Sequence, residues 1–198
     1  MLGAILLLPL AACGSGSPDS SQSDTPSDAA TSATVSMADD GTAESEPTDS
    51  ASPEAGDILA LEGLGDLRIG QPVPSGSSWA ERGAQISEEC RTVSSPRYPG
   101  VYAIVTGDKV RRITLGQRST VLLAEGIGPG ASESEVTTRF PGFREEPHAY
   151  SGAPAKYLTA PVGKQGGPAL RFEIGPDGKV SLIHVGTMPE LSFVEGCA

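Results

Sequence analysis

Short runs of apolar and β-branched residues, separated by glycine or proline every few positions, dominate the chain after residue 57. Runs of this length and composition are typical of β-strands. Two of the joints between them, Gly107-Asp108 and 175–178, carry residues that reverse antiparallel strands. We therefore expect antiparallel hairpins. The expected strands are 100–106, 109–115, 119–124, 155–161, 169–174, 179–185 and 191–194.

Helical signal is confined to 78–85 and to a stretch from Ser132 to Phe140. The second stretch is the stronger candidate, because Ser132 can cap the helix and Glu135 follows three residues later. Val136 and Phe140 also fall on one helical face. The sequence thus predicts two short helices, one before each group of strands.

The two halves of this region resemble each other. The segment DKVRRITLG at 108–116 aligns with GKVSLIHVG at 178–186, an offset of 70 residues. A repeat of this size predicts two copies of one supersecondary unit. We expect an α+β fold of two tandem units, at about 60–118 and 119–197, each a short helical segment plus an antiparallel β-meander. The alternative is a chance similarity between two edge hairpins.

The N-terminal third of the chain has a different composition. Residues 15–56 consist mainly of Ser, Asp, Thr, Ala, Pro and Glu, so they cannot bury enough apolar surface to fold. Of the 25 acidic residues in the chain, nine lie in this segment, whereas none of the 14 basic residues does. The remainder therefore carries a charge of only −2, out of −11 in total. With a nearly neutral domain, a nucleic-acid partner is not expected.

An apolar stretch from Leu2 to Ala12 precedes this acidic segment. It is too short to cross about 30 Å of hydrocarbon, which needs roughly 20 apolar residues. Its length matches the core of a signal peptide, about 7–15 residues. The alternative is a buried apolar strand, but 15–56 offer nothing folded to cover it.

The junction Leu10-Ala11-Ala12-Cys13 resembles a bacterial lipobox. The resemblance implies that residues 1–12 are a signal peptide, which is removed, and that Cys13 carries lipid. Residues 13–56 would then form a disordered acidic linker between the membrane and a domain at 57–198. The implied location is the bacterial cell envelope, with the domain outside the cytoplasm.

The segment GIGPGASESEVTTRFPG at 126–142 resembles the beginning of small envelope domains. These domains are typified by the outer-membrane assembly lipoprotein BamE and by the secreted β-lactamase inhibitor protein, a tandem of two such units. The resemblance would cover 60–197 and implies a tandem α+β fold with a non-enzymatic, protein-binding or scaffold role. No binding residue is carried over by position.

The cysteine count fits an exported protein. With Cys13 assigned to lipid, Cys90 and Cys197 remain as an even pair that can form a disulfide in an oxidising compartment. Two free buried thiols are the alternative. A thiol redox site is not expected, because the sequence has no Cys-x-x-Cys pair.

No catalytic signature appears in the sequence, and we predict no catalytic residue, cofactor or metal ligand. The two imidazoles, His148 and His184, are not associated with a Gly-x-Ser-x-Gly elbow or a Cys–His pairing. His184 is expected on a sheet face because its strand alternates. The acidic residues before His148 have no second cluster to complete a metal site. Arg111-Arg112 is expected on a solvated strand face.

A binding role is the remaining expectation, with an envelope or secreted protein as the partner, or a role in maintaining the envelope. Tyr98, Phe143 and Tyr150 are the candidate contacts, because aromatic residues dominate interface hot spots. Proline and glycine restrict the backbone around them, which lowers the entropy lost on binding. The alternative is that these three side chains cover the hairpin core.

Two competing functions stay open at this point. A small-ligand or glycan-binding module would place aromatics, Tyr102 among them, around a cleft. An unrecognised hydrolase would instead bring His148 or His184 together with a nucleophile and a carboxylate in a pocket.

Overall fold

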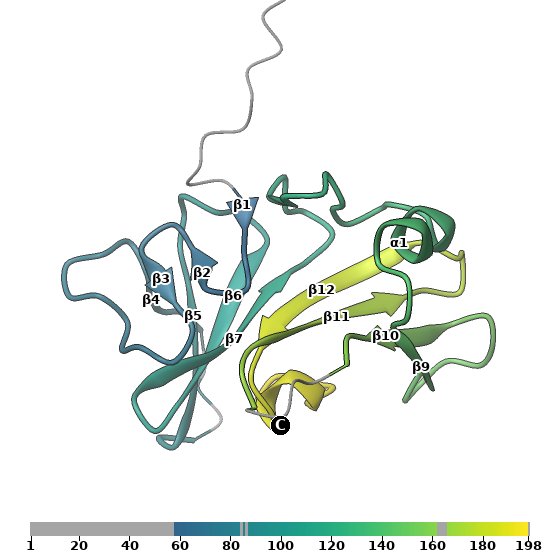
Figure 1. The fold of residues 1–198 in the computed structure, drawn as a ribbon. Helices are drawn as coiled ribbons and strands as arrows, with labels where there is room; N and C mark the ends of the chain where they lie inside the picture. The colour runs from purple at the N-terminus through teal and green to yellow at the C-terminus, as the bar shows by residue number, and fades with distance from the viewer. Residues whose placement is uncertain (1–57, 84, 86, 162–165, 198) are drawn as a thin grey trace, which may run out of the picture. The chain divides into compact units, whose positions relative to one another are not determined.

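An eight-stranded antiparallel sheet forms the frame of the protein (Figure 1). The structure, a computed structural model, describes residues 58–83, 85, 87–161 and 166–197, all within one compact unit. Across the sheet the strands follow the order β4-β5-β6-β7-β12-β11-β10-β9. Their bounds are Ala80–Glu81 (β4), Cys90–Ser94 (β5), Val101–Thr106 (β6), Lys109–Leu115 (β7), Arg144–Pro147 (β9), Lys156–Thr159 (β10), Ala169–Ile174 (β11) and Val180–Gly186 (β12).

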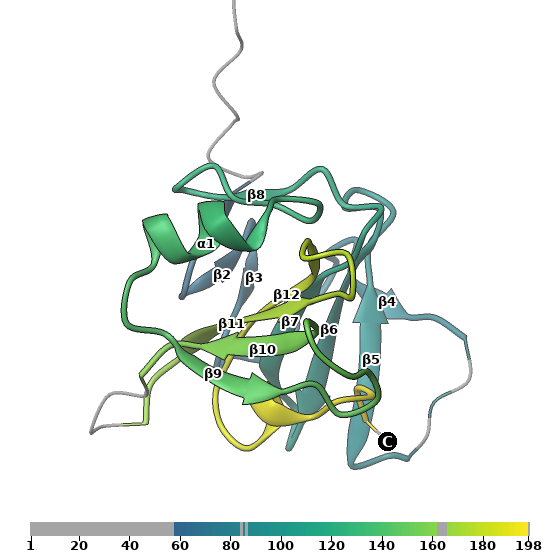
Figure 2. The same cartoon turned by 90° about the vertical axis from the view of Figure 1, so that its right-hand side faces the viewer.

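The short strands and the α-helix lie along one side of this sheet (Figures 1 and 2). β1 pairs with β8 in parallel, and β2 pairs with β3 antiparallel. A 3₁₀ helix, η2, follows the last strand near the C-terminus. The bounds are Ile58–Leu59 (β1), Gly63–Leu64 (β2), Leu67–Arg68 (β3), Leu122–Leu123 (β8), Glu133–Arg139 (α1) and Glu190–Ser192 (η2).

The expected pair of helix-plus-meander units does not form. Strands β4–β7 of the first half and β9–β12 of the second join through the β7–β12 pair into one sheet, over one core cluster. The described part of the chain contains one α-helix, α1, of seven residues. The predicted α+β fold of two tandem units at 60–118 and 119–197 is therefore wrong, and the protein is mostly β.

The segment predicted as the first helix, 78–85, is extended instead. Trp79 is buried and its ring stacks on that of Tyr98, with 5.7 Å between the ring centroids. The next two residues, Ala80 and Glu81, pair with β5. A backbone that places an indole in the core and then joins a sheet edge must be extended, so tertiary packing overrides the weak helical pattern.

The predicted second helix is confirmed as α1. The Ser132 hydroxyl accepts a hydrogen bond from the Glu135 N–H, and the Glu135 carboxylate accepts one from the Ser132 N–H at 2.8 Å. These bonds form a capping box, and the Ser132 N–H and hydroxyl, which donate to the carboxylate, lower the pKa of Glu135. Val136 is fully buried, and the Phe140 ring packs against Phe172, 5.3 Å between centroids.

The two hairpins that align in sequence also share a backbone irregularity. The register shifts in β6–β7 leave Arg111 as a bulge, and those in β11–β12 leave Ser181, 70 positions later. Gly107 and Asp108 form the two-residue turn between β6 and β7, each with φ of 57°. This is the I′ geometry expected of a tight hairpin. The likeness covers the hairpins and does not extend to a helix.

The remaining strand predictions differ in outcome. Four expected strands are confirmed as β6, β7, β11 and β12, and 155–161 is shortened to β10. Of 119–124 only the two residues of β8 pair. The expected strand at 191–194 is wrong: the chain forms η2 at 190–192, and backbone carbonyls there accept hydrogen bonds from a buried arginine of β7.

Alternation along the strands gives the sheet two different faces. On β7, Ile113 and Leu115 belong to the main core cluster, which also includes Val136 of α1. Arg112 and Thr114, between and beside them, point to the opposite face, yet both are fully buried. The sheet therefore has an apolar face under the short elements and a polar face that is also covered.

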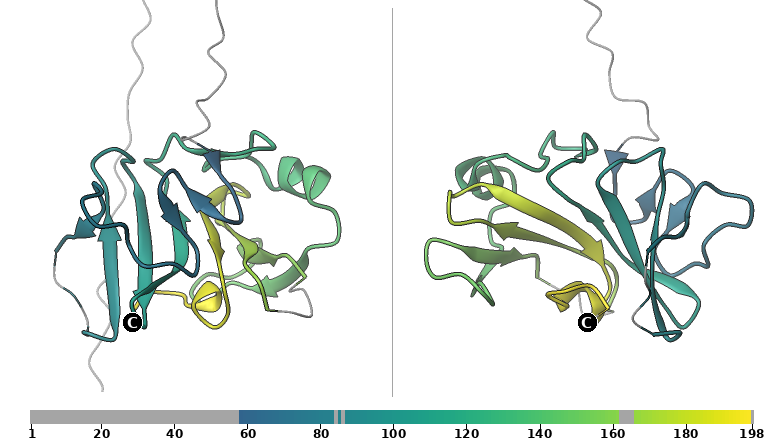
Figure 3. Two further views of the ribbon diagram at one scale, coloured as in Figure 1. Left: turned by 60° about the vertical axis from the view of Figure 1, so that its left-hand side comes forward. Right: turned by 180° about the vertical axis from the view of Figure 1, so that it is seen from behind.

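The C-terminal segment, residues 187–197, covers part of the polar face (Figures 1 and 3). Thr187 N–H donates to the Arg111 carbonyl at 2.9 Å, and Leu191 is 1% exposed. A disulfide joins Cys197 to Cys90 of β5, with Cα atoms 5.6 Å apart. The predicted pairing of these cysteines is confirmed. The predictions for 1–12, Cys13 and the linker lie outside the described residues.

Candidate functional site

A row of polar side chains crosses the second face of the sheet from β5 to β10. Successive cross-strand pairing in the ladder makes its members neighbours. The four members nearest β10 are buried, whereas the two nearest β5 are half-buried. The row is therefore covered at its centre and open at one end. Its members in order are Ser94, Tyr102, Thr114, His184, Arg171 and Thr159.

His184 occupies the centre of this row in a neutral form. Its Nδ1 lies 2.9 Å from the Thr114 hydroxyl oxygen. Burial lowers the pKa of His184 well below its usual value, and the positive charges of Arg112 and Arg171 lower it further. The prediction that His184 is a sheet-face residue fits this position. The sheet face is covered at this point, so the His184 imidazole is a buried structural group.

Arg112 is a fully buried cation beside the row, not the solvated side chain expected from the sequence. Its Nη1 donates to the Glu190 and Phe193 carbonyl oxygens, at 3.0 Å and 2.5 Å. Burial lowers the pKa of Arg112, and neighbouring Tyr102 raises it. Arginine nevertheless stays protonated in proteins. The side chain therefore places a positive charge next to Tyr102 and holds the C-terminal segment through its hydrogen bonds.

His148 is also held by the structure. Its Nδ1 accepts hydrogen bonds from the N–H groups of Tyr150 and Ser151, both at 3.1 Å. The proton must then lie on Nε2, which faces the Glu173 carboxylate at 3.3 Å. The ring stacks on Tyr157, with 5.0 Å between centroids. Both ring nitrogens therefore have structural partners.

The arrangement around Glu173 differs from that of a serine hydrolase. Ser181 Oγ donates to the Glu173 carboxylate at 3.0 Å, so the acid stands between the serine and His148. Acyl-transfer triads need the histidine in the middle position. Within the described ranges, no three His, Cys, Asp or Glu side chains gather as metal ligands. No helix in those ranges is long and apolar enough to span a membrane.

A cavity of about 770 Å³ lies at the open end of the polar row. Three parts of the chain form it: the 94–100 loop with the start of β6, the turn at 116–118 after β7, and Arg82 beyond β4. We call it the loop cavity. Its lining residues are Arg82, Ser94, Ser95, Pro96, Tyr98, Gly100, Val101, Tyr102, Gly116, Gln117 and Arg118.

Close backbone contact between two loops builds this cavity. The Gly116 N–H donates to the Gly100 carbonyl at 2.9 Å. Gly100 has φ of 78°, and a Cβ at that position would lie 2.6 Å from the Ser119 nitrogen. Only glycine fits, both in conformation and in space. Ser95 stiffens the other side of the loop, because its Oγ accepts the Arg97 N–H at 3.1 Å.

The charged side chains of the loop cavity are both arginines. Arg82 and Arg118 are exposed, and no Asp or Glu lines the cavity. Arg82 Nε donates to the Ser94 carbonyl at 3.4 Å, which ties it to the end of β5. No carboxylate of the described residues lies within ion-pair distance of either arginine. The loop cavity is therefore a concave, positively charged site.

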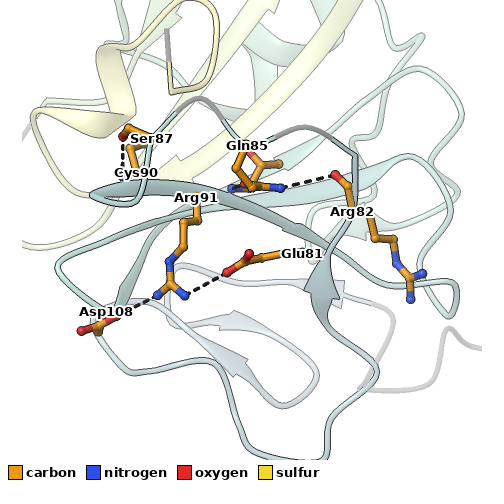
Figure 4. Close-up of polar contacts among 8 residues, drawn as sticks. Glu81, Arg82, Gln85, Ser87, Cys90, Arg91 and Asp108 are labelled. Atoms are coloured by element: carbon orange, nitrogen blue, oxygen red, sulfur yellow. Dashed lines mark hydrogen bonds and ion pairs between the residues drawn. The ribbon is translucent and has the colours of Figure 1, made fainter.

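A second arginine site nearby has a different charge balance, because its arginine contacts carboxylates (Figure 4). Arg91 donates to Glu81 at 2.9 Å and to Asp108 at 2.7 Å, and all three line a separate cavity of about 400 Å³. We call it the neutralised cavity. Figure 4 shows the Arg82 guanidinium pointing away from this group. Arg82, just after β4, and Arg91 of β5 thus belong to two separate sites, and only the site of Arg91 contains carboxylates.

The three predicted contact residues lie apart from one another. Tyr98 is 3% exposed, so the alternative assignment to the core holds for its ring, although it also lines the loop cavity. Phe143 packs against Phe140 and Phe172 and lines a separate, mainly apolar cavity of about 440 Å³. Tyr150 is 68% exposed, and its hydroxyl donates to Glu195. They do not form one surface.

Comparisons with known proteins add little to this geometry. No protein-family model matches the chain, and no curated protein matches it. A solved structure that aligns with it is the crystal structure of the uncharacterized protein yfeY from Escherichia coli, at 16% identity and a TM-score of 0.37. The alignment covers 65% of this chain and 99% of that chain. A similarity this low supports no argument about fold or function.

Proposed function

We propose that this protein is a lipid-anchored domain of the bacterial cell envelope that binds a small polar ligand or glycan and catalyses no reaction. The observation that carries the binding role is the loop cavity, which gathers two tyrosines and two arginines from separate parts of the sequence. Aromatic and convergent polar groups in one concave site are the usual features of ligand pockets. A ligand site therefore accounts for more of the geometry than a flat protein-binding face.

The anchoring part of the proposal rests on the sequence at Cys13 and on the acidic linker that follows it. The disulfide between Cys90 and Cys197 supports export, because disulfides persist in oxidising compartments. A charged, self-repelling linker extends. It would hold the domain away from the membrane surface and leave the loop cavity accessible.

Replacement of the lipid acceptor tests the anchor. Cys13→Ser should release the protein from the membrane fraction, because each buried methylene of an acyl chain contributes about 0.8 kcal/mol. The measurements are cell fractionation and incorporation of labelled palmitate into the wild type. Unchanged membrane association of the variant, with no label in the wild type, would refute the anchor.

Filling the loop cavity tests the binding role. Ser94→Phe enlarges a half-buried side chain of the lining. Glu81→Phe is the control, because Glu81 pairs with Val93 on the other face of the β4–β5 ladder and lines the neutralised cavity. The full chain would be incubated with saccharide fragments released from bacterial cell walls by muramidase, and retained fragments identified by mass spectrometry. Retention by the wild type and Glu81→Phe, but not by Ser94→Phe, is expected. Equal retention by all three, or none, would contradict the proposal.

A protein partner is the second candidate, and the exposure of Tyr150 favours it. The side chain is 68% exposed although a hydrogen bond to Glu195 holds its hydroxyl in place. An ordered, exposed tyrosine loses little conformational freedom on binding. Tyr150→Ala should then weaken capture of a partner by the full chain, whereas Ser94→Phe should not.

A further inference from the structure

The geometry points to an oxyanion as the group that the loop cavity recognises: a phosphate or carboxylate carried by a larger polar molecule and contacted by Arg82 and Arg118. This inference rests on the proposed binding function and names the chemistry of the ligand. Guanidinium groups bind both oxyanions through paired N–H donors. The chemistry shared by the two is therefore a planar or tetrahedral anion with several acceptor oxygens.

The charge balance of the loop cavity differs from that of the neutralised cavity, whose lining includes Glu81 and Asp108. Arg91 contacts two carboxylates, and so does Lys156, which contacts Glu133 and Glu145. Arg82 and Arg118 contact none within the described ranges, and the cavity they line contains no acid. Their charges are therefore available to an incoming anion without breaking an existing ion pair.

A buried arginine interacts with one lining residue of the loop cavity. Tyr102 lines the cavity and also interacts with the buried guanidinium of Arg112. A charge in a protein interior is screened less than one in water, so this guanidinium adds to the positive potential near Tyr102.

The size and the uncharged lining indicate that the oxyanion is part of a larger ligand. A volume of about 770 Å³ is in the range of sites for drug-sized molecules, far above the size of one phosphate ion. The remaining lining includes the polar side chains of Ser94 and Gln117 beside the ring of Tyr102. Hydroxyl and amide groups next to an aromatic ring suit a sugar-like body that carries the anion.

Isothermal titration of the full chain at low salt tests this assignment with four probes: glucose 1-phosphate, glucuronate, glucose and inorganic phosphate. We expect glucose 1-phosphate or glucuronate to bind, and the stronger of the two identifies the oxyanion as phosphate or carboxylate. Inorganic phosphate should bind more weakly than glucose 1-phosphate, and glucose should not bind. Raising the salt concentration should weaken binding, because the contacts are exposed charges.

Matched variants assign the effect to residues. Arg82→Gln and Arg118→Gln should each weaken binding of the charged sugar by about tenfold or more. Arg82→Lys, which keeps the charge but loses the planar fork, should weaken it less. Arg91→Gln in the neutralised cavity should leave affinity unchanged. Circular dichroism and thermal melting check that each variant is folded, which is expected because the two arginines are exposed.

Three results would overturn the assignment. The first is no binding of either charged sugar, and the second is an equal effect of Arg91→Gln. The third is glucose binding that matches the charged sugars and is insensitive to Arg82→Gln. If Ser94→Phe abolishes that glucose binding, the cavity is a ligand site without anion recognition, and the proposed function stands while this inference fails.

Discussion

The centre and the open end of the polar sheet face use the same kind of side chain in different ways. At the centre, the Arg112 guanidinium donates to carbonyls of the C-terminal segment, and His184 is held neutral beside Thr114. At the open end, Arg82 and Arg118 line the loop cavity without a carboxylate partner among the described residues. The two regions differ because the C-terminal segment covers the centre and leaves the other end open.

The difference shows how one face can serve both stability and binding. A buried cation must be hydrogen-bonded, because leaving it unpaired is strongly destabilising. An exposed cation has no such requirement, and its bond to a ligand replaces bonds to water. Arg112 is therefore expected to determine folding, and Arg82 and Arg118 to determine binding.

Removing the disulfide should have the largest effect on stability. It frees the C-terminal segment, which covers the centre of the polar face. Cys90→Ser combined with Cys197→Ser removes a link between residues 107 positions apart. The loop-closure model gives a loss of roughly 4–5 kcal/mol in the free energy of unfolding. Urea denaturation with and without a reductant measures it. A loss below about 1 kcal/mol would mean that the C-terminal segment is held mainly by other contacts.

Substitution of the buried arginine should have the next largest effect. Arg112→Met keeps an unbranched stem but removes the guanidinium, which leaves the Glu190 and Phe193 carbonyls without their donor. We expect a loss of about 3 kcal/mol in the free energy of unfolding. Arg82→Met is the matched control at the open end and should change stability by less than about 0.5 kcal/mol. Equal effects of the two variants in urea denaturation would contradict the comparison.

The pH dependence of stability isolates the central histidine. Because the pKa of His184 is lowered in the folded state, below about pH 6.5 the unfolded chain binds a proton that the folded protein does not. Stability should therefore fall as the pH drops through 6.5, by at most about 1.4 kcal/mol per pH unit from this residue. His184→Gln removes the titration, so its stability curve between pH 7.5 and 5 should be flatter. Parallel curves for wild type and variant would show that His184 is not the cause.

Removing an arginine from either cavity should have the smallest effects on stability. The Arg91 side chain is 34% exposed, and partly exposed ion pairs contribute about 0–1 kcal/mol. Arg91→Gln should lower the free energy of unfolding by less than about 1 kcal/mol, whereas Arg118→Gln should leave it unchanged within about 0.5 kcal/mol. Thermal and urea denaturation of both variants make the test. A larger loss in Arg118→Gln would indicate a structural role at the open end.

Local patterns in the sequence predicted the local structure well. Turn residues at Gly107-Asp108 and the Ser132–Glu135 capping box act through hydrogen bonds between near neighbours, and both are found as expected. The segment 78–85 failed because its conformation is decided by distant partners, Trp79 packing on Tyr98 and β4 pairing with β5. The tandem arrangement failed for the same reason: the β7–β12 pairing that merges both halves has no local signal.

The candidate site was only partly accessible from the sequence. The sequence pointed to Tyr98 as an aromatic residue in a proline-restricted stretch, and Tyr98 does line the loop cavity. Arg82 and Arg118 carried no signal, because they lie 36 positions apart and only the fold brings them to one cavity. The prediction for Arg112 was wrong. Two adjacent arginines in the sequence suggested an exposed basic face, whereas the C-terminal segment buries the Arg112 side chain.

Nuclear magnetic resonance of the arginine Nε–Hε groups tests the central claim most directly, because it observes both arginine sites in one sample. The full chain, labelled with ¹⁵N, would be titrated with glucose 1-phosphate and with glucuronate, and the side-chain resonances assigned through Arg82→Gln, Arg118→Gln and Arg91→Gln. The account predicts that at least one of the two sugars shifts the resonances of Arg82 and Arg118 together, with a common affinity, while that of Arg91 stays unchanged. Shifts of all three arginines in proportion, or no shift at Arg82 and Arg118 with either sugar, would contradict it.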